Sequence, residues 1–327
     1  MEDFKEKSIY KYASVDTAIK IIDSERVLLN NPDNFNDPFD VMINIDDEEI
    51  NKSFDLYYNY SLQQKFTQID LNEIRDKVLK KRILLVQNKI NKAKKIEYIS
   101  EVNELSRLLY QNDYDKKIEK NSFKLKISNF QNYIRNCTFI TCFSYDNNSN
   151  LMWSNYGDFH RGVCIEIENK SIIFRDVTYT DKRPFFDIYQ DINEILCKKV
   201  NEEKNVYGSE KTKKNIISLF CTKSKDWSYE NEVRFIILID KNQKNNINLT
   251  GITLENEKYY LNIQVKKIFI GIKARGEKME QLIQLASEKN IPVVYMKDNK
   301  KEYLIVEDKD RNSNKEKENK VKLWNKD

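Results

Sequence analysis

The sequence contains little glycine, proline and histidine, and it has no long hydrophobic segment. Its 327 residues include 6 glycines, 4 prolines and one histidine, His160. A single histidine argues against a histidine-rich zinc or iron site. No apolar run approaches the ~20 residues that a membrane-spanning helix requires, and Met1-Glu2-Asp3-Phe4 does not begin a signal peptide. We therefore expect a cytoplasmic protein that does not enter a membrane.

The cysteines are few and widely spaced, with no CxxC motif among them. They are Cys137, Cys142, Cys164, Cys197 and Cys221. An odd number without metal-ligand spacing is typical of reduced core cysteines in a cytoplasmic protein.

Charged residues are abundant, but their signs nearly cancel. Lysine and arginine number 56 against 52 acidic residues, so the formal net charge is +4. This balance argues against a protein that coats nucleic acid, although a local basic patch remains possible.

A long segment without glycine or proline runs from Phe39 to Tyr156. Within it, apolar residues recur at intervals of three or four, namely Leu71, Ile74 and Val78, then Ile96, Ile99, Val102, Leu105 and Leu108. This periodicity predicts amphipathic helices, and we expect a helical insertion over residues 50–131. Its basic cluster consists of Lys89, Lys92, Lys94 and Lys95. A solvated helix face explains that cluster better than a nucleic-acid contact does, although the insertion could dock a protein partner.

The rest of the chain alternates short strands with helices. The clearest predicted strands are Thr138–Ser144, Val163–Ile167 and Val233–Ile239, which are rich in β-branched and aromatic residues. We predict an α+β fold with a mixed, mostly antiparallel sheet and flanking helices, forming one domain over residues 1–307. Residues 308–327 are polar and charged and are expected to be disordered.

The most informative stretch runs from Asp226 to Asp240. Its second half predicts a buried strand, and Glu230 and Glu232 stand where that strand begins. Side chains two residues apart on a strand point to the same face, so both carboxylates would enter one space if the strand begins at Glu230. Like charges placed side by side need a cation or a catalytic purpose. The alternative is a solvated strand end where Arg234 pairs with one glutamate.

Several other polar and aromatic residues are candidates to join the two glutamates. Lys11 lies between two tyrosines, Ser144 ends a strand, and Arg161 precedes Gly162, where backbone amides could approach a phosphate. His160, next to Arg161, is a further candidate. Simpler alternatives exist: Lys11 could be a surface lysine, Ser144 could cap the following loop, and His160 could be a hydrogen-bonded structural residue. Together they supply the cations, rings, hydroxyl and carboxylates of a site for a charged nucleotide.

Five motifs resemble one bacterial family, called domain of unknown function 2971 (DUF2971). They are Ile9-Tyr-Lys-Tyr12, FNDPFD at residues 35–40, CFS at 142–144, LMWSNYGDFHRGVCIEI at 151–167 and WSYENEVRF at 227–235. They occur in the family's order along nearly the whole chain, apart from the insertion and the tail. The family name itself implies no chemistry.

A more distant resemblance connects the chain to the ADP-ribosyltransferase superfamily. A first strand with a polar residue between aromatics, a middle strand ending in a hydroxyl and a late strand opening with Glu-x-Glu are similar to that superfamily's pattern. The resemblance implies NAD as substrate, Glu232 as the catalytic glutamate, Glu230 as the residue that engages the acceptor, and Ser144 and Lys11 at the other two positions. At the first position of the pattern, Lys11 stands where the superfamily usually has histidine or arginine.

In such a site, a carboxylate near the ribose would stabilise the oxocarbenium-like transition state of nicotinamide loss. The candidate NAD-binding residues are Lys11, Tyr12, Ser144, Trp153, Tyr156, His160 and Arg161. Of these, Lys11 or Arg161 would hold the pyrophosphate, and Tyr12, Tyr156 or Trp153 would stack on nicotinamide. No GxGxxG fingerprint supports a Rossmann-type site instead. Such an enzyme could be a toxin or a phage-defence effector that modifies nucleic acid or protein.

Two other classes of function stay open. In a metal-dependent nuclease, Asp226, Glu230 and Glu232 would bind magnesium, although Arg234 stands where an ExK motif would have lysine. In a non-catalytic defence protein, the insertion would bind another component.

Overall fold

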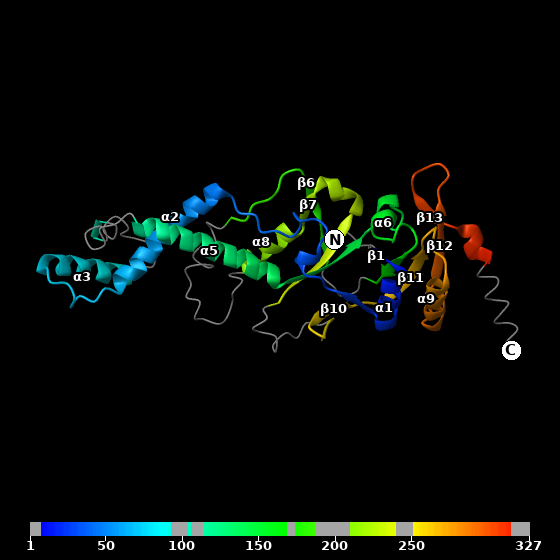
Figure 1. Cartoon of the computed structure of the whole chain (residues 1–327), viewed down its shortest axis with the longest axis horizontal. Coiled ribbons are helices and arrows are strands. Elements are labelled where there is room, and N and C mark those ends of the chain that lie inside the picture. Colours follow the sequence, from blue (N-terminus) through cyan, green and yellow to red (C-terminus); the bar gives the residue numbers. More distant parts are fainter. Residues whose placement is uncertain are drawn as a thin grey trace, which may run out of the picture. The chain divides into compact units, whose positions relative to one another are not determined.

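The computed structural model describes residues 8–92, 104–105, 114–168, 174–187, 210–239 and 251–314. The chain divides into two compact units (Figure 1). The sheet unit comprises Met1–Val41, Arg135–Arg183 and Cys221–Asp327, and the helical unit comprises Met42–Ile134 and Pro184–Phe220. The helical unit thus contains the whole of the predicted insertion, residues 50–131, together with a later segment of the chain.

The sheet unit is built on an eight-stranded mixed sheet, which confirms the α+β prediction. Its strand order is β13-β12-β11-β4-β1-β3-β8-β5. The strands are β1 (Ile9–Ala13), β3 (Thr138–Ser144), β4 (Val163–Ile167), β5 (Arg175–Asp176), β8 (Glu232–Leu238), β11 (Val265–Ile270), β12 (Val293–Asp298) and β13 (Ile305–Glu307). Only β11 and β12 pair in parallel; the other neighbours in this sheet are antiparallel.

The sheet opens between β1 and β3. These strands share one register pair, Tyr10 opposite Ser144, whereas β3 and β8 pair along seven residues from Thr138–Leu238 to Ser144–Glu232. Lys11 fills part of the opening, because its Nζ donates a hydrogen bond to the carbonyl oxygen of Cys142 at 2.8 Å.

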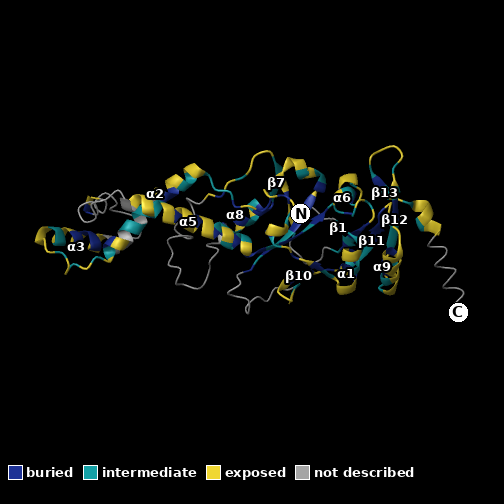
Figure 2. Ribbon diagram, in the orientation of Figure 1, coloured by how far each residue is buried: buried dark blue, intermediate teal, exposed yellow. Residues whose placement is uncertain are grey.

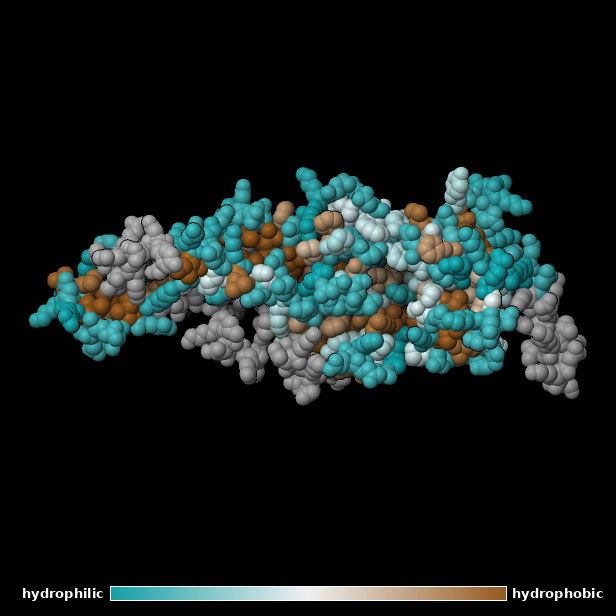
Figure 3. Space-filling model, in the orientation of Figure 1, coloured by the Kyte–Doolittle hydropathy of each residue, from teal (hydrophilic) through white to brown (hydrophobic). Residues whose placement is uncertain are grey.

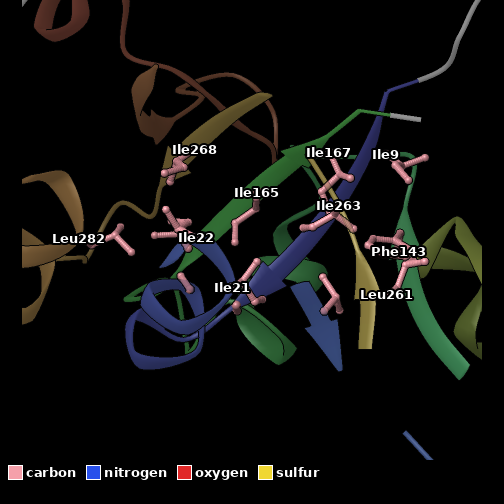
Figure 4. Close-up of a cluster of buried hydrophobic side chains, with 14 of the residues drawn as sticks. Ile9, Ile21, Ile22, Phe143, Ile165, Ile167, Leu261, Ile263, Ile268 and Leu282 are labelled. Carbon is pink, nitrogen blue, oxygen red and sulfur yellow. The ribbon is translucent and has the colours of Figure 1, made fainter. Parts of the chain in front are cut away.

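One face of the sheet carries the larger hydrophobic core (Figure 4). Helices α1 (Val15–Ser24) and α9 (Glu277–Glu288) cover this face with apolar side chains at helical spacing, including Ile22 and Leu282. Ser14 caps α1 by accepting a hydrogen bond from the backbone N–H of Thr17.

The opposite face carries a second, mostly aromatic core. Because side chains alternate along a strand, Ile9 and Ala13 enter the first core whereas Tyr12 enters the second. Trp153 from α6 (Asn150–Asn155) is fully buried there beside Tyr12.

The helical unit contains α2 (Asp47–Thr67), α3 (Lys77–Lys92) and α8 (Glu210–Phe220), and most of α5 (Tyr114–Asn136). Phe66, Ile83, Val86 and Leu105 form a small core. The predicted helix through Leu71 and Ile74 is wrong, because both lie in the link between α2 and α3 and pack against this core. Ile96, Ile99, Val102 and Leu108 lie outside the described residues, as do Lys94 and Lys95.

Smaller elements complete the sheet unit. β2 (Arg26–Leu28), β9 (Ile252–Glu255) and β10 (Lys258–Asn262) form a three-stranded sheet, and β6 (Thr178–Thr180) pairs in parallel with β7 (Thr222–Ser224). The tail differs from its prediction at its start, because residues 309–314 are helical; residues 315–327 lie outside the described part.

The surface is mixed in character. On the face drawn in Figure 3, hydrophilic residues predominate and hydrophobic ones are scattered among them. Figure 2 shows buried and exposed residues alternating along α2 and α5, as expected for helices with one packed side. No helix in the described ranges is long and apolar enough to span a membrane.

Candidate functional site: a buried carboxylate and cation cluster

Strand β8 begins at Glu232, two residues later than the sequence suggested as possible. Glu230 ends a 3-10 helix, η3 (Lys225–Glu230), and Asn231 takes a left-handed conformation with φ 41°. The two carboxylates therefore do not share a face because of strand geometry. A turn brings them together, and the side chain of Lys223 lies between them.

Glu232 is held by the arginine two residues along its own strand. Arg234 donates from Nε to Glu232 Oε1 at 2.8 Å and from Nη2 to Oε2 at 2.9 Å. Positions 232 and 234 face the same side of β8, so this fork-shaped pairing follows from the strand. Arg234 is fully buried and Glu232 is 5% exposed. The pairing of Arg234 with one glutamate, predicted as the simpler alternative, is therefore present, but it is buried rather than solvated.

Asp40 supplies a third carboxylate from the FNDPFD turn. Arg234 Nη1 and Nη2 donate to Asp40 Oδ1 and Oδ2 at 2.8 and 2.6 Å. The turn is fixed locally, because Asp37 Oδ1 accepts a hydrogen bond from the backbone N–H of Phe39. Asp40 itself is 3% exposed. Arg234 thus binds two carboxylates at once, as the planar guanidinium group allows.

Lys223 is the second buried cation of the cluster. Its Nζ lies 2.6 Å from Glu230 Oε2, 3.5 Å from Glu232 Oε2 and 3.6 Å from Asp40 Oδ2. Burial alone would lower the pKa of Lys223, but these carboxylates raise it above its usual value. Lys223 therefore stays charged and links all three acids.

The remaining oxygen of Glu230 accepts a hydrogen bond from a tyrosine. Tyr156, which follows α6, donates from its hydroxyl to Glu230 Oε1 at 2.5 Å. Glu230 is 4% exposed. Both of its oxygens therefore have partners within the protein.

The two glutamates have pKa values shifted in opposite directions. Burial raises the pKa of Glu230, and Lys223 opposes that rise only in part. Burial also acts to raise the pKa of Glu232, but Arg234 outweighs it and lowers the value to about 2. Opposite shifts in neighbouring carboxyl groups are a feature of acid–base pairs, although buried structural ion pairs produce shifts too.

Ser144 and Lys11 approach the cluster without joining its ion pairs. Ser144 is opposite Glu232 in the β3–β8 register, and its Oγ donates to the backbone oxygen of Glu230 at 2.6 Å. Ser144 Oγ also accepts from the backbone N–H of Asp146, so it holds the loop after β3 in place. The Lys11 ammonium is bound to Cys142 O, and burial lowers its pKa. Lys11 Nζ also lies 3.4 Å from Thr141 Oγ1, and the contact of Lys11 with a pyrophosphate stays a prediction.

Tyr12 and Trp153 form part of the aromatic core. Tyr12 donates its hydroxyl to the backbone oxygen of Asp146, and Trp153 donates Nε1 to that of Asn147. Trp153 has no exposed surface, so its predicted stacking on nicotinamide is wrong for this conformation.

His160 and Arg161 lie in a surface turn between α6 and β4. Asp158, Phe159 and His160 have consecutive positive φ values of 48°, 54° and 69°, a conformation that costs non-glycine residues energy. Gly162 permits the turn to pack closely, since a Cβ there would lie 2.2 Å from the backbone oxygen of Ala13. Arg161 is exposed and pairs with Asp158 within the turn.

The magnesium site of the nuclease alternative is not assembled. Asp226 is exposed, and its backbone N–H bonds to Ser224 Oγ at the start of η3. The described ranges contain no group of three or more acidic, histidine or cysteine side chains disposed to hold a metal ion.

Of the predicted site residues, the structure brings together Glu230, Glu232 and Tyr156, with Ser144 alongside. Sequence reasoning missed Asp40 and Lys223, and treated Arg234 only as an alternative partner. The FNDPFD motif was a signal for Asp40, but Lys223 lies outside every quoted motif.

The fold and the site together define a class: an α+β protein with an ion cluster buried at β8, the strand next to the edge strand β5 of its main sheet. A family model described as protein of unknown function (DUF2971) matches residues 152–235. The match contains WSYENEVRF and nearly all of the motif at 151–167, and it supports the resemblance to that family. The other three motifs lie before it. No curated protein and no solved structure matches the chain.

Proposed function

We propose that the protein is an ADP-ribosyltransferase-like enzyme that cleaves the nicotinamide–ribose bond of NAD and transfers ADP-ribose. The observation that carries the proposal is the alignment of three strands. β1, β3 and β8 are neighbours, and Tyr10, Ser144 and Glu232 are in register across them. These are the strands that bear the three elements of the resemblance in the sequence.

Glu232 suits the role of an anion beside the reacting ribose. Positive charge develops on the ribose as the bond to nicotinamide breaks, and a fixed carboxylate stabilises that charge. Arg234 keeps Glu232 ionised across the physiological pH range and fixes its orientation. A carboxylate anchored at the start of a strand is preorganised for this purpose.

Glu230 suits the complementary role of a base. A pKa raised by burial makes a carboxylate a stronger base than usual. In the proposed transfer, the carbon–nitrogen bond breaks and nicotinamide leaves with the electron pair. The acceptor's oxygen or nitrogen then bonds to the ribose carbon, and its proton passes to Glu230. The acceptor belongs to a nucleic acid or a protein, and the helical unit selects it or docks a partner. Such an activity suits a bacterial toxin or a phage-defence effector.

The test measures nicotinamide release from NAD by purified wild-type protein and by Glu232→Gln. Removing the charge is expected to slow release by about a hundredfold, the usual effect of losing a main electrostatic contributor. Glu166→Gln is the matched control. Glu166 is also opposite Tyr10, on the other side of β1, and its carboxylate bonds to Ser8. Equal release by wild type and Glu232→Gln, with circular dichroism confirming that both are folded, would end the proposal.

A non-catalytic binding protein is the second candidate, and one observation favours it. Both oxygens of Glu232 already accept hydrogen bonds from Arg234, as they would in a purely structural ion pair. Under this alternative, neither NAD cleavage nor label transfer from NAD to protein, DNA or RNA would be detected, and the cluster would serve only stability.

A further inference from the structure

Aromatic side chains border the buried cluster where it meets solvent. Trp227 and Tyr229 come from η3, and their ring centroids lie 6.1 Å apart at an interplanar angle of 37°. Both are half-buried, in contrast to the fully buried Trp153. The chain therefore presents two neighbouring rings beside Glu230, the residue that ends the same helix.

Trp227 lies against Lys223. The Lys223 Nζ is 4.6 Å from the centroid of the indole ring, and the lysine side chain is only 4% exposed. One face of the indole thus packs on the buried ammonium, a favourable cation–π contact. Trp227 is half-buried, so part of its side chain remains accessible to solvent.

One asparagine side chain contacts Tyr229, and a second contacts Tyr156, which bonds to Glu230. Asn155 Nδ2 donates to the Tyr229 hydroxyl at 3.1 Å, and Asn36 Nδ2 lies 3.4 Å from the Tyr156 hydroxyl. Both asparagines are exposed. Each amide keeps a carbonyl oxygen and further donor capacity that can meet the edge of a ligand.

We propose that Trp227 and Tyr229 form a stacking site for the planar heteroaromatic ring of a nucleotide, with Asn155 contacting the ring's edge. The inference deepens the proposed function, because it names the substrate class for the same site. Aromatic side chains stack on any base through its π face, and nearby amides bond to its polar edge. The ring belongs either to a free nucleotide such as NAD or to an unpaired base in a nucleic acid.

The experiment is isothermal titration calorimetry of the full chain with AMP, NAD and a single-stranded DNA oligonucleotide. Trp227→Phe keeps a ring over Lys223, whereas Trp227→Ala removes it. We expect Trp227→Phe to bind within about threefold of wild type and Trp227→Ala to bind at least tenfold more weakly, because stacking on one base is commonly worth that much. Tyr229→Leu should also weaken binding. It keeps the Trp227 ring over Lys223, so it tests the stacking site even if Trp227→Ala does not fold.

Tyr303→Ala is the matched control, since Tyr303 is 96% exposed and belongs to neither the buried cluster nor the proposed stacking site. It should bind as wild type does. Tighter binding of NAD and AMP identifies a free nucleotide as the source of the ring, and tighter binding of the oligonucleotide identifies a nucleic acid. No binding of any of the three ligands, or equal binding by wild type, Trp227→Ala and Tyr229→Leu, would overturn the inference.

The outcome is separable from that of the proposed function. AMP and the oligonucleotide contain no nicotinamide, so their binding does not depend on cleavage. Binding that requires Trp227 without any nicotinamide release would keep the stacking site and reject the transferase. Nicotinamide release that is unaffected by the loss of both rings would keep the transferase and reject the stacking site.

Discussion

Charged residues behave differently in the two units of the molecule. In the helical unit, Arg82 pairs with Glu104 at 2.8 Å, but their side chains are 46% and 61% exposed. In the sheet unit, Arg234 binds Asp40 and Glu232 at similar distances, and all three are almost completely buried. The distance between the charged atoms is therefore similar in the two kinds of pair, and what distinguishes them is how far their side chains are exposed to solvent.

The difference in burial determines what each group of charges can do. Water screens an exposed pair, which usually contributes little to stability. A buried carboxylate without its cation would carry a large desolvation penalty. The same low dielectric strengthens electrostatic effects on pKa values and on a developing positive charge. The catalysis proposed above therefore depends on the buried cluster rather than on the surface lysines.

The largest expected effect comes from removing the buried arginine. Arg234→Met leaves Asp40 and Glu232 with Lys223 as their only cation in the cluster, and should lower the free energy of unfolding by about 3–5 kcal/mol. Arg82→Met, the control on the exposed pair, should change it by less than about 1 kcal/mol. Urea unfolding followed by tryptophan fluorescence measures the effect of Arg234→Met, because Trp153 and Trp227 lie in the sheet unit with Arg234. Far-ultraviolet circular dichroism, which reports on helices, measures the effect of Arg82→Met in the helical unit. Equal, small losses would show that burial does not separate the two kinds of pair.

A somewhat smaller effect is expected from acid. The folded-state pKa of Glu232 is lowered from 4.5 to about 2, so its stabilising contribution is complete above pH 4.5. That contribution is lost as the pH falls towards 2, and amounts to about 3 kcal/mol. The raised pKa of Glu230 acts in the opposite direction, because its protonation favours the folded state.

Wild type should therefore lose stability over this pH window, and Glu232→Gln should lose less. Thermal unfolding at a series of pH values measures the two slopes. Parallel curves for the two proteins would mean that Glu232 does not titrate as its pairing with Arg234 requires.

The smallest effect is expected in the helical unit. Replacing Lys89, Lys92, Lys94 and Lys95 with glutamine should leave folding intact and nicotinamide release unchanged within about twofold, because the sequence predicts a solvated helix face for this cluster and charges on such a face contribute little. A fall in label transfer to the acceptor would indicate that this unit selects it. Loss of nicotinamide release without any acceptor would contradict a role in specificity alone.

Local patterns in the sequence were sufficient to predict several strands of the sheet, but not their order in it. The β-branched runs at Thr138–Ser144 and Val163–Ile167 form strands as predicted. The β8 start was less certain, since only the left-handed backbone of Asn231 decides that the strand begins at Glu232. Helical periodicity likewise could not reveal that Leu71 and Ile74 lie in the link between α2 and α3 and pack against the core of the helical unit from there.

The site was predicted only in part, because its partners come from distant points in the chain. Glu232 and Arg234 are neighbours on one strand, so their pairing was foreseeable. Asp40 lies 194 residues before Arg234, and no local pattern reports such a contact. Similarly, the aromatic character of Trp153 suggested stacking, whereas only packing shows that it is enclosed in the core.

Two neighbouring glutamates with different ionisation are central to the proposed site. The most direct measurement is a pH titration by NMR of protein labelled with ¹³C at the glutamate carboxyl carbons, assigned with Glu230→Gln and Glu232→Gln. We predict that the Glu232 signal stays ionised down to about pH 2, whereas the Glu230 signal titrates above its ordinary value of 4.5. Titration of both signals together near pH 4.5 would contradict the account.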